Sequence, residues 1–223
     1  MTTILITGAN RGIGLEMCRQ CKARGDTVIA VCRKRSSELD ALDVEIIDSV
    51  DVRQIADLQA LRHALDGRQI DILMHVAGIL SKQTLGGIDA QAVGQIHLQF
   101  DTNAIAPLLV TQALMDLIPQ GGKIGILTSR MGSIADNDSG GNYGYRMSKA
   151  AVNAAGKSLA VDLKPRGISV ALLHPGFVRT DMTGHQGLID ADASVRGLLA
   201  RIDALTLKES GSFWHQNGET LPW

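Results

Sequence analysis

A glycine-rich turn near the N-terminus, T-G-A-N-R-G-I-G over residues 7–14, most constrains how this chain can fold. It follows an apolar run at 3–7 that predicts a strand, and it precedes a segment at 15–24 that predicts a helix. In such a turn Gly8 permits the tight bend, Gly12 lets a ligand approach the backbone, and Gly14 lets helix pack closely on strand. Backbone N–H groups and the positive helix end can then receive a pyrophosphate. The turn therefore predicts a dinucleotide site.

Strand-like and helix-like segments alternate along the rest of the chain. Further strands are predicted at 27–32, 44–47, 70–76, 123–128, 168–173 and 211–215, and helices at 54–65, 90–117, 143–163 and 192–207. The helix at 90–117 is expected to start irregularly. This order predicts an α/β fold in which one doubly wound, Rossmann-type parallel sheet of about seven strands carries helices on both faces. We expect residues 1–223 to form a single domain.

The composition argues against several classes of function. The 223 residues carry 22 basic and 23 acidic side chains, a net charge of -1, and only 3% aromatic residues. Neither nucleic acid nor a membrane is therefore an expected partner. No signal peptide is evident, so a cytoplasmic location is expected. Cys18 and Cys21 form a C-x-x-C pattern inside the first helix, where two small packing side chains are favoured over a redox pair. No metal site is expected.

A second motif, Y-x-x-x-K, places Tyr145 and Lys149 on one face of a predicted helix. Residues four apart lie about 5–6 Å from each other on a helix surface. A nearby cation favours the phenolate and lowers the pKa of a tyrosine, which makes Tyr145 a plausible acid at neutral pH. Tyr143 is the rival phenol, but Met147 occupies its i+4 position. A hydride-carrying dinucleotide beside a proton-transferring phenol predicts an oxidoreductase for small carbonyls or alcohols.

The choice of dinucleotide is predicted from the end of the second strand. An NAD site places an acidic residue there, whereas an NADP site uses arginine to bind the 2′-phosphate. Here the strand is followed by Arg33, Lys34 and Arg35, with no carboxylate before Glu38, and Arg11 adds a cation within the glycine turn. NADP(H) is therefore favoured over NAD(H).

These motifs, in this order, resemble the short-chain dehydrogenase/reductase superfamily over essentially the whole chain. The matching pieces are the glycine turn, Asp51-Val52, Ala77-Gly78, Asn103, Ser129, Tyr145 with Lys149, Pro175-Gly176 and Thr180. The run Y-G-Y-R-M-S-K-A-A-V-N from Tyr143 and the tail G-E-T-L-P-W look like the C-factor and sniffer type of carbonyl reductase.

The resemblance implies roles for individual residues. Tyr145 is the general acid and base, Lys149 lowers its pKa and holds the nicotinamide ribose, Ser129 binds the substrate oxygen, and Asn103 holds a water that connects Lys149 to solvent. The implied cofactor contacts, besides Tyr145 and Lys149, are Gly8, Asn10, Arg11, Gly12, Ile13, Gly14, Arg33, Asp51, Val52, Ala77, Gly78, Pro175, Gly176, Val178 and Thr180.

Several of these residues keep an alternative interpretation. Asp51 is either an adenine contact or the N-cap of a helix starting near Arg53, and Thr180 is either a cofactor contact or an N-cap. Asn103 could instead satisfy helix backbone. Ser133 and Ser139 are rivals of Ser129, which is preferred because it ends a strand.

One departure from the family pattern concerns the fourth strand. The family commonly shows N-N-A-G there, and this chain has His75-Val76-Ala77-Gly78. Val76 cannot form a side-chain hydrogen bond, and His75 is expected to be a hydrogen-bonded core histidine more than a proton carrier.

The segment at 183–210 matches no pattern of its own, and the resemblance implies that it covers the substrate. Its apolar residues, Leu188, Ile189, Val195, Leu198 and Leu199, predict a mostly apolar cover and hence small apolar aldehydes, ketones or quinones as substrates. The resemblance also implies a homodimer or homotetramer. The competing class is a cofactor-bound regulatory or signalling protein with little turnover.

Overall fold

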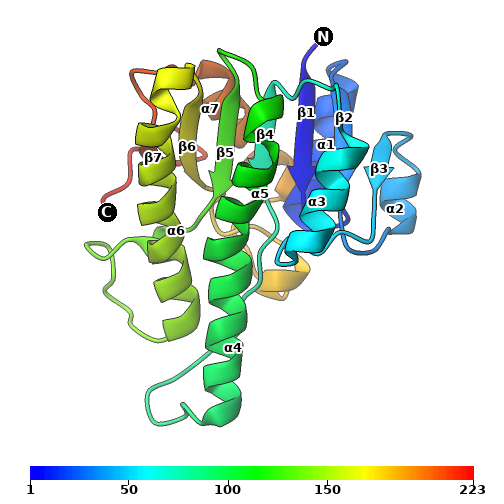
Figure 1. Ribbon diagram of the computed structural model, residues 1–223. Coiled ribbons are helices and arrows are strands. Elements are labelled where there is room, and N and C mark those ends of the chain that lie inside the picture. Colours follow the sequence, from blue (N-terminus) through cyan, green and yellow to red (C-terminus); the bar gives the residue numbers. More distant parts are fainter.

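The structure, a computed structural model, describes residues 1–223 and contains one seven-stranded sheet with the order β3-β2-β1-β4-β5-β6-β7 (Figure 1). Every neighbouring pair of strands is parallel, as the alternating sequence pattern predicted. The strands are β1 (Thr3–Thr7), β2 (Thr27–Val31), β3 (Glu45–Ile47), β4 (Ile72–His75), β5 (Lys123–Leu127), β6 (Ser169–His174) and β7 (Ser212–His215).

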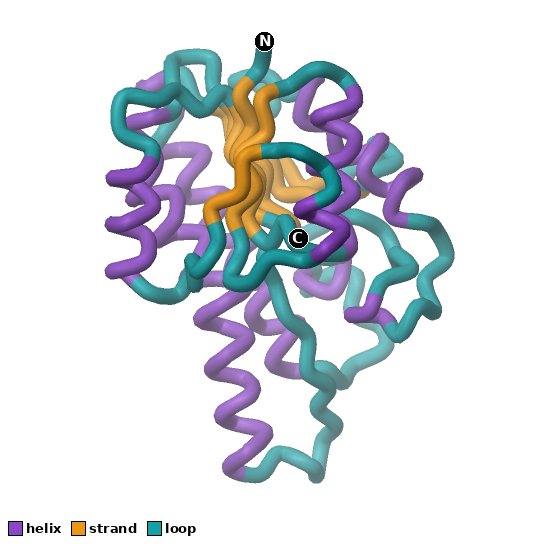
Figure 2. Tube along the Cα trace, turned by 90° about the vertical axis from the view of Figure 1, so that its right-hand side faces the viewer, coloured by secondary structure: helices purple, strands orange, loops and turns teal.

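Helices cover both faces of this sheet (Figure 2), which confirms the doubly wound α/β fold. They are α1 (Gly12–Ala23), α2 (Ser37–Asp40), α3 (Ile55–Ala64), α4 (Ala90–Phe100), α5 (Ala106–Leu114), α6 (Tyr143–Asp162) and α7 (Ala191–Ala204). Successive side chains of a strand point to opposite faces, so Leu5 packs in the core under α3, α5 and α6 while Ile4 and Ile6 pack under α1 and α7. None of the helices has the length and apolar character needed to cross a membrane.

The predicted helix at 90–117 is interrupted in its middle and begins regularly. Asp89 caps α4 by accepting a hydrogen bond from the Ala92 N–H at 2.8 Å, so the expected irregular start was wrong. A π-helical segment, Asp101–Ile105, separates α4 from α5. Pro107 explains the break, because proline has no N–H to return to the carbonyl of the preceding turn. The widened turn carries Asn103, one of the predicted site residues.

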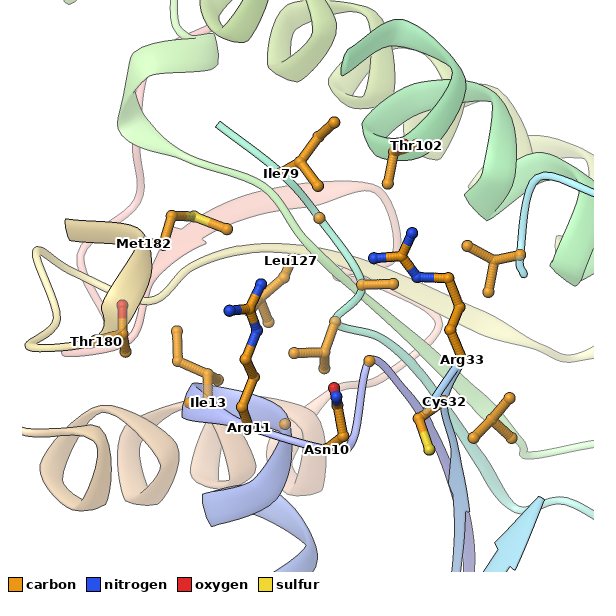
Figure 3. A pocket seen from close by; sticks show the side chains of 18 of the residues that line it. Asn10, Arg11, Ile13, Cys32, Arg33, Ile79, Thr102, Leu127, Thr180 and Met182 are labelled. Atoms are coloured by element: carbon orange, nitrogen blue, oxygen red, sulfur yellow. The ribbon is translucent and has the colours of Figure 1, made fainter. Parts of the chain in front are cut away.

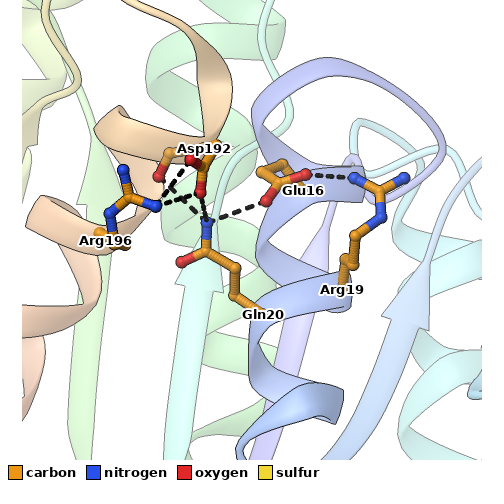
Figure 4. A network of polar contacts seen from close by, with 5 residues as sticks. All are labelled: Glu16, Arg19, Gln20, Asp192 and Arg196. Atoms are coloured by element: carbon orange, nitrogen blue, oxygen red, sulfur yellow. Dashed lines mark hydrogen bonds and ion pairs between the residues drawn. The ribbon is translucent and has the colours of Figure 1, made fainter.

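A polar network ties α1 to α7 at the surface (Figure 4). The Gln20 side-chain amide donates to the Glu16 carboxylate at 2.8 Å and to the Asp192 carbonyl at 3.0 Å. Arg19 pairs with Glu16, and Arg196 pairs with Asp192. Exposed ion pairs contribute little stability each, but this network joins the helix that follows the glycine turn to the last helix of the fold.

Cys18 and Cys21 lie on the inner face of α1 with no exposed surface. Burial raises the pKa of each thiol to about 12, so both stay protonated at neutral pH. They act as small core side chains, as the helical pattern indicated.

Candidate active site

A cavity with a volume of about 540 Å³ opens at the carboxyl ends of the central strands (Figure 3). Ligands of open parallel sheets bind in this position, in the crevice where the strand order reverses. The volume lies within the range of small-molecule and cofactor sites. The cavity wall is assembled from the segments at the carboxyl ends of β1 to β6, together with α6.

The glycine turn forms the floor of the cavity. Gly8 and Gly12 have φ of 68° and 55°, in the left-handed region that glycine tolerates. A Cβ on Gly8 would lie 2.7 Å from the Ala77 backbone, and one on Gly14 would lie 2.2 Å from the Gly8 carbonyl oxygen. The α1 N-cap, Arg11, forms no side-chain cap. The first N–H groups of α1 are thus available to an anion, which fits a pyrophosphate.

The predicted cofactor residues line this cavity with two exceptions, Gly176 and Val178. Gly176 has φ of 86°, and a Cβ there would lie 2.9 Å from Ile189 Cδ1. Val178 is buried, and the Arg179 N–H beside it donates to the Ile189 carbonyl at 2.9 Å. Both residues therefore pack within the loop after β6 and do not line the cavity.

Asp51 lines the cavity but does not cap a helix. Its carboxylate accepts a hydrogen bond from the Arg53 N–H at 3.0 Å and pairs with the Arg53 guanidinium. The hydrogen bonds from Arg53, with the nearby charge of Arg33, hold the pKa of Asp51 below its ordinary value. Helix α3 begins at Ile55 with Gln54 at its N-cap position, so the N-cap interpretation of Asp51 was wrong.

The end of β2 and the glycine turn both supply cations to the same cavity. The guanidinium groups of Arg33 and Arg11 extend into it (Figure 3), and Lys34 also contributes to its wall. Arg11 lies 3.6 Å from the Asp181 carboxylate across the opening. Arg35 points away and pairs with a carboxylate on the outer surface. Of the three consecutive basic residues, Arg33 and Lys34 therefore face the cavity.

Tyr145 and Lys149 lie side by side on α6, as their spacing predicted. The Lys149 ammonium is 5.7 Å from the centre of the Tyr145 ring, and both side chains line the cavity while being largely buried. Lys149 Nζ donates to the Leu127 carbonyl at 2.8 Å. Ser129, two residues beyond Leu127, lies close enough to the Tyr145 side chain to lower its pKa. The structure thus brings three of the predicted catalytic residues together.

Burial dominates the electrostatics of this group. It raises the pKa of Tyr145 to about 12, against the smaller, opposing effect of the nearby Ser129 side chain. It also lowers the pKa of Lys149 to about 8. The structure therefore gives Tyr145 a raised pKa and not the lowered one that the helical spacing predicted, because burial of the phenol is the dominant cause. Tyr145 carries its proton at neutral pH.

Asn103 joins the site through the loop after β4. Its Oδ1 accepts from the Ile79 N–H at 2.9 Å, and its Nδ2 donates to the Ile79 carbonyl at 2.9 Å and to Ser148 Oγ at 3.0 Å. The side chain therefore satisfies the backbone of a loop and not that of its own helix. A Cβ on Gly78 would lie 3.3 Å from Asn103 Oδ1 and 3.8 Å from Lys149 Nζ. Asn103 and Lys149 flank Gly78.

The rival serines are engaged elsewhere. Ser133 Oγ accepts from the Asp136 N–H at 3.1 Å, and Ser139 Oγ accepts from the Arg146 guanidinium at 2.7 Å. Ser129 Oγ also accepts from the Met131 N–H at 3.1 Å, which fixes its position at the end of β5. Of these three serines, only Ser129 is close enough to Tyr145 to influence its pKa.

His75 is a core residue. Its Nε2 lies 3.0 Å from Thr111 Oγ1, and burial lowers its pKa to about 3, so the ring is neutral. The Thr7 hydroxyl accepts from the Val76 N–H at 3.1 Å and braces β4 against β1. The departure from N-N-A-G therefore leaves the strand end hydrogen-bonded by other groups.

The segment predicted to cover the substrate, 183–210, consists of a loop up to residue 190, helix α7 and the residues that follow it. Val195, Leu198 and Leu199 belong to α7 and are buried against α1, so they cannot contact a substrate, and their part in the predicted cover was wrong. Met182 lines the cavity, and Leu188 lies exposed on the same loop. Any cover is thus confined to the loop before α7.

Thr180 is both a residue of the cavity wall and an N-cap residue, as its two interpretations proposed. It lines the cavity, and it also occupies the N-cap position of a short 3-10 turn at Asp181–Thr183, where its N–H donates to Thr183 Oγ1 at 3.1 Å.

Twelve further cavity residues were not among the predicted contacts. They are Val31, Cys32, Lys34, Val50, Arg53, Val76, Ile79, Thr102, Leu127, Thr128, Asp181 and Met182. Most are immediate neighbours of predicted residues, as Ile79 is of Gly78 and Thr102 of Asn103. In the sequence, only their position next to a motif residue could have indicated that they line the cavity.

Comparison with known proteins agrees with this geometry. Residues 2–188 match the family profile described as short chain dehydrogenase. The chain is 39% identical to 1-hydroxy-2-glutathionyl-2-methyl-3-butene dehydrogenase of Rhodococcus sp. (strain AD45), over all of both chains. It is 43% identical to C-signal of Myxococcus xanthus over 69% of this chain and 93% of that protein.

Solved carbonyl reductase structures share the fold at full length. The carbonyl reductase Sniffer of D. melanogaster superimposes with a TM-score of 0.91 and 30% identity, covering 100% of both chains. The NADPH-bound carbonyl reductase from chicken fatty liver gives a TM-score of 0.90 and 29% identity, covering 100% of this chain and 99% of that one. With the profile match, the glycine turn and the Tyr145–Lys149 pair, these likenesses show that the chain belongs to the short-chain dehydrogenase family of oxidoreductases, with the C-factor and sniffer type among its relatives.

Proposed function

We propose that this protein transfers hydride between NADP(H) and a small carbonyl or alcohol, with Tyr145 as general acid and base. The observation that carries the proposal is that Tyr145 and Lys149 line the cavity whose floor is the glycine turn, with the Ser129 side chain close to Tyr145. The bound nicotinamide supplies or accepts the hydride. The protein has then to bind the substrate oxygen and move one proton.

Each member of the group has a separate task in this proposal. Ser129 donates a hydrogen bond to the substrate oxygen and fixes its position, and Tyr145 protonates that oxygen as it gains charge. Lys149 holds the ribose hydroxyls beside Tyr145. Asn103, which borders Gly78 together with Lys149, holds the water that returns a proton from solvent.

The raised pKa of Tyr145 favours reduction at neutral pH. With a pKa of about 12 the phenol is protonated throughout the physiological range, which is the form required of a proton donor. Oxidation of an alcohol requires the phenolate and should therefore accelerate as the pH rises.

Arg33 and Arg11 support the preference for NADP(H). Both guanidinium groups extend into the cavity, Arg33 from the end of β2 and Arg11 from the glycine turn (Figure 3). The 2′-phosphate of the adenosine ribose binds near the end of the second strand in sites of this kind. The structurally similar carbonyl reductase from chicken fatty liver holds NADPH. Asp51 and Val52, which line the same cavity, are then the adenine contacts.

Replacing Arg33 with alanine should weaken NADPH binding about 10- to 100-fold while changing the NADH affinity little, because charge-assisted hydrogen bonds contribute about 1.5–3 kcal/mol. Fluorescence titration of both nucleotides measures the two dissociation constants. Arg35→Ala is the matched control, since Arg35 pairs with Asp48 outside the cavity. Equal affinities in the parent, or an unchanged preference in Arg33→Ala, would contradict the assignment.

The substrate is proposed to be a small, largely apolar aldehyde, ketone or quinone. Met182 and Ile79 present apolar surface to the cavity, and the exposed Phe177 and Leu188 lie on the loop after β6. The Rhodococcus relative is named for a glutathionyl substrate, so a polar conjugate belongs in the test panel. At fixed NADPH, a higher specificity constant for conjugates than for apolar carbonyls would reject the apolar class and leave the reductase assignment intact.

A second candidate function is signalling with little turnover, which the likeness to C-signal favours. The retained group of Tyr145, Ser129 and Lys149 argues against it, because a non-catalytic role requires no proton donor. Absence of nicotinamide oxidation across the whole panel, in a protein that binds NADPH, would support signalling.

The homodimer or homotetramer also remains a proposal. Helices α5 and α6 expose Leu108, Met147 and Val161, which a second copy could cover. Sedimentation velocity of the protein measures the assembly directly.

A further inference from the structure

Helix α6 begins without a cap of its own, although it carries Tyr145 in its first turn. The residue at the N-cap position, Asn142, has φ of 49° and ψ of 42°, and its side chain forms no cap hydrogen bond. A capping residue has an extended backbone, and its side chain accepts from the N–H of the second or third helical residue. The N–H groups at the start of α6 therefore need an acceptor from elsewhere in the chain.

Gln83, from the loop after β4, provides that acceptor. Its side-chain Oε1 accepts from the Gly144 N–H at 3.0 Å, which is the bond that a capping side chain normally forms. Its backbone carbonyl accepts from the Asn142 N–H at 2.8 Å. One residue that is 61 positions from Gly144 in the sequence thus satisfies two N–H groups at the start of the helix.

The burial of Gln83 sets it apart from its surroundings. It is 5% exposed, whereas the residues from Thr84 to Ala90 are exposed. Its Nε2 donates to Ser81 Oγ at 2.8 Å, which orients the amide so that Oε1 faces the helix. The following residues of the loop are exposed to solvent, and the loop is held to the start of α6 by the hydrogen bonds of Gln83.

Gly144 is fitted closely to this arrangement. A Cβ at that position would lie 2.5 Å from Gln99 Nε2 and 3.1 Å from Gln83 Oε1. Gln99 has no exposed surface, and its Oε1 accepts from the Ser81 N–H at 3.0 Å. The two glutamines and the missing side chain of Gly144 form one packed unit directly before Tyr145.

The same loop is fixed at its other end to the site. Asn103 binds the N–H and the carbonyl of Ile79, and Ile79 lines the cavity. The segment 79–83 therefore runs as a strap from the cavity wall, along α4 and its π-helical continuation, to the start of α6.

We propose that Gln83 is a positioning residue for the reaction, which caps α6 from a remote loop and thereby fixes the hydroxyl of Tyr145 relative to Ser129. This inference rests on the proposed function. Because Tyr145 is the third residue of α6, fraying of the first turn would move its phenol, and misplacement of a reacting group by about 1 Å can cost on the order of 10²-fold in rate.

The test compares Gln83→Met, which keeps the volume and removes the acceptor, with Gln83→Glu, which keeps the acceptor. We expect Gln83→Met to lower kcat by at least about tenfold with the NADPH dissociation constant within about twofold of the parent. Gln83→Glu should retain kcat within about threefold, since a carboxylate is favoured at a helix N-terminus. Lys82→Met, the same replacement at the exposed neighbour, is the control and should behave as the parent.

Amide hydrogen exchange provides a readout that does not depend on turnover. The Gly144 N–H should exchange at least about tenfold faster in Gln83→Met than in the parent, because its hydrogen bond is lost. Unchanged exchange, an unchanged kcat in Gln83→Met, or an equal loss of kcat in Gln83→Glu would each overturn the proposal. A parent protein without turnover contradicts the proposed function alone, and the exchange of Gly144 then still decides whether Gln83 caps the helix.

Discussion

Replacing Tyr145 with phenylalanine should lower kcat for carbonyl reduction by at least about 10²-fold, which is the usual contribution of a positioned general acid. The substitution removes one oxygen atom. The ring stays packed in its buried position, so the fold and the cavity are preserved. Stopped-flow measurement of NADPH oxidation in single turnover isolates the proton-coupled step from product release.

The control is Tyr143→Phe, since Tyr143 lies on the same helix and is not part of the cavity wall. It should behave as the parent in kcat and in KM. The NADPH dissociation constant of Tyr145→Phe should stay within about threefold of the parent value, because the phenol contributes at most one hydrogen bond to the ribose. Near-parent turnover by Tyr145→Phe with any reducible substrate would remove Tyr145 from the role of acid.

Replacing Lys149 with methionine should abolish turnover and at the same time make the protein without cofactor more stable. Burial lowers the pKa of Lys149 from its ordinary value of 10.5 to about 8, so folding disfavours the charged form. A shift of this size corresponds to about 3 kcal/mol. The methionine also leaves the Leu127 carbonyl without the hydrogen bond from Lys149, which offsets part of the gain. The expected net stabilisation at pH 7 is about 1–3 kcal/mol.

The pH dependence distinguishes this cause from better packing. A lysine whose pKa is lowered on folding destabilises the folded state fully below about pH 8, and the effect fades as the pH rises toward 10.5. Urea denaturation of parent and variant should therefore show a constant advantage of Lys149→Met below pH 8 that shrinks at pH 9 and pH 10. An advantage independent of pH, or none at all, would contradict burial of the charge as the cause.

The predicted loss of turnover and gain of stability in Lys149→Met have one cause, the buried charge of Lys149. A buried ammonium beside a buried phenol is unfavourable for the fold, and the proposed proton transfer requires it. The arrangement proposed for activity is therefore not the most stable one. Loss of activity with gain of stability is the result that marks Lys149 as a functional residue and not a structural one.

Much of the fold follows from local patterns in the sequence. The strands at 3–7 and 27–31 are short apolar runs, and the turn between β1 and α1 needs glycine at positions that its backbone angles single out. Neighbouring side chains on one helical face must meet, so the approach of Tyr145 and Lys149 was fixed by their spacing. Patterns of this kind depend on residues close together in the chain, and they could be predicted from it.

Tertiary structure decided what depends on the surroundings of a residue. Spacing predicted that Lys149 lowers the pKa of Tyr145, but the pKa is set by how much water the fold excludes, and burial raises it. The residues of α7 appeared to be a cover for the substrate, yet the same apolar stripe serves to pack α7 against α1. The cap of α6 comes from Gln83, far away in the chain, because only the folded loop brings the amide to Gly144. Desolvation and contacts between remote segments are properties of the assembled core, so no local pattern in the sequence could show them.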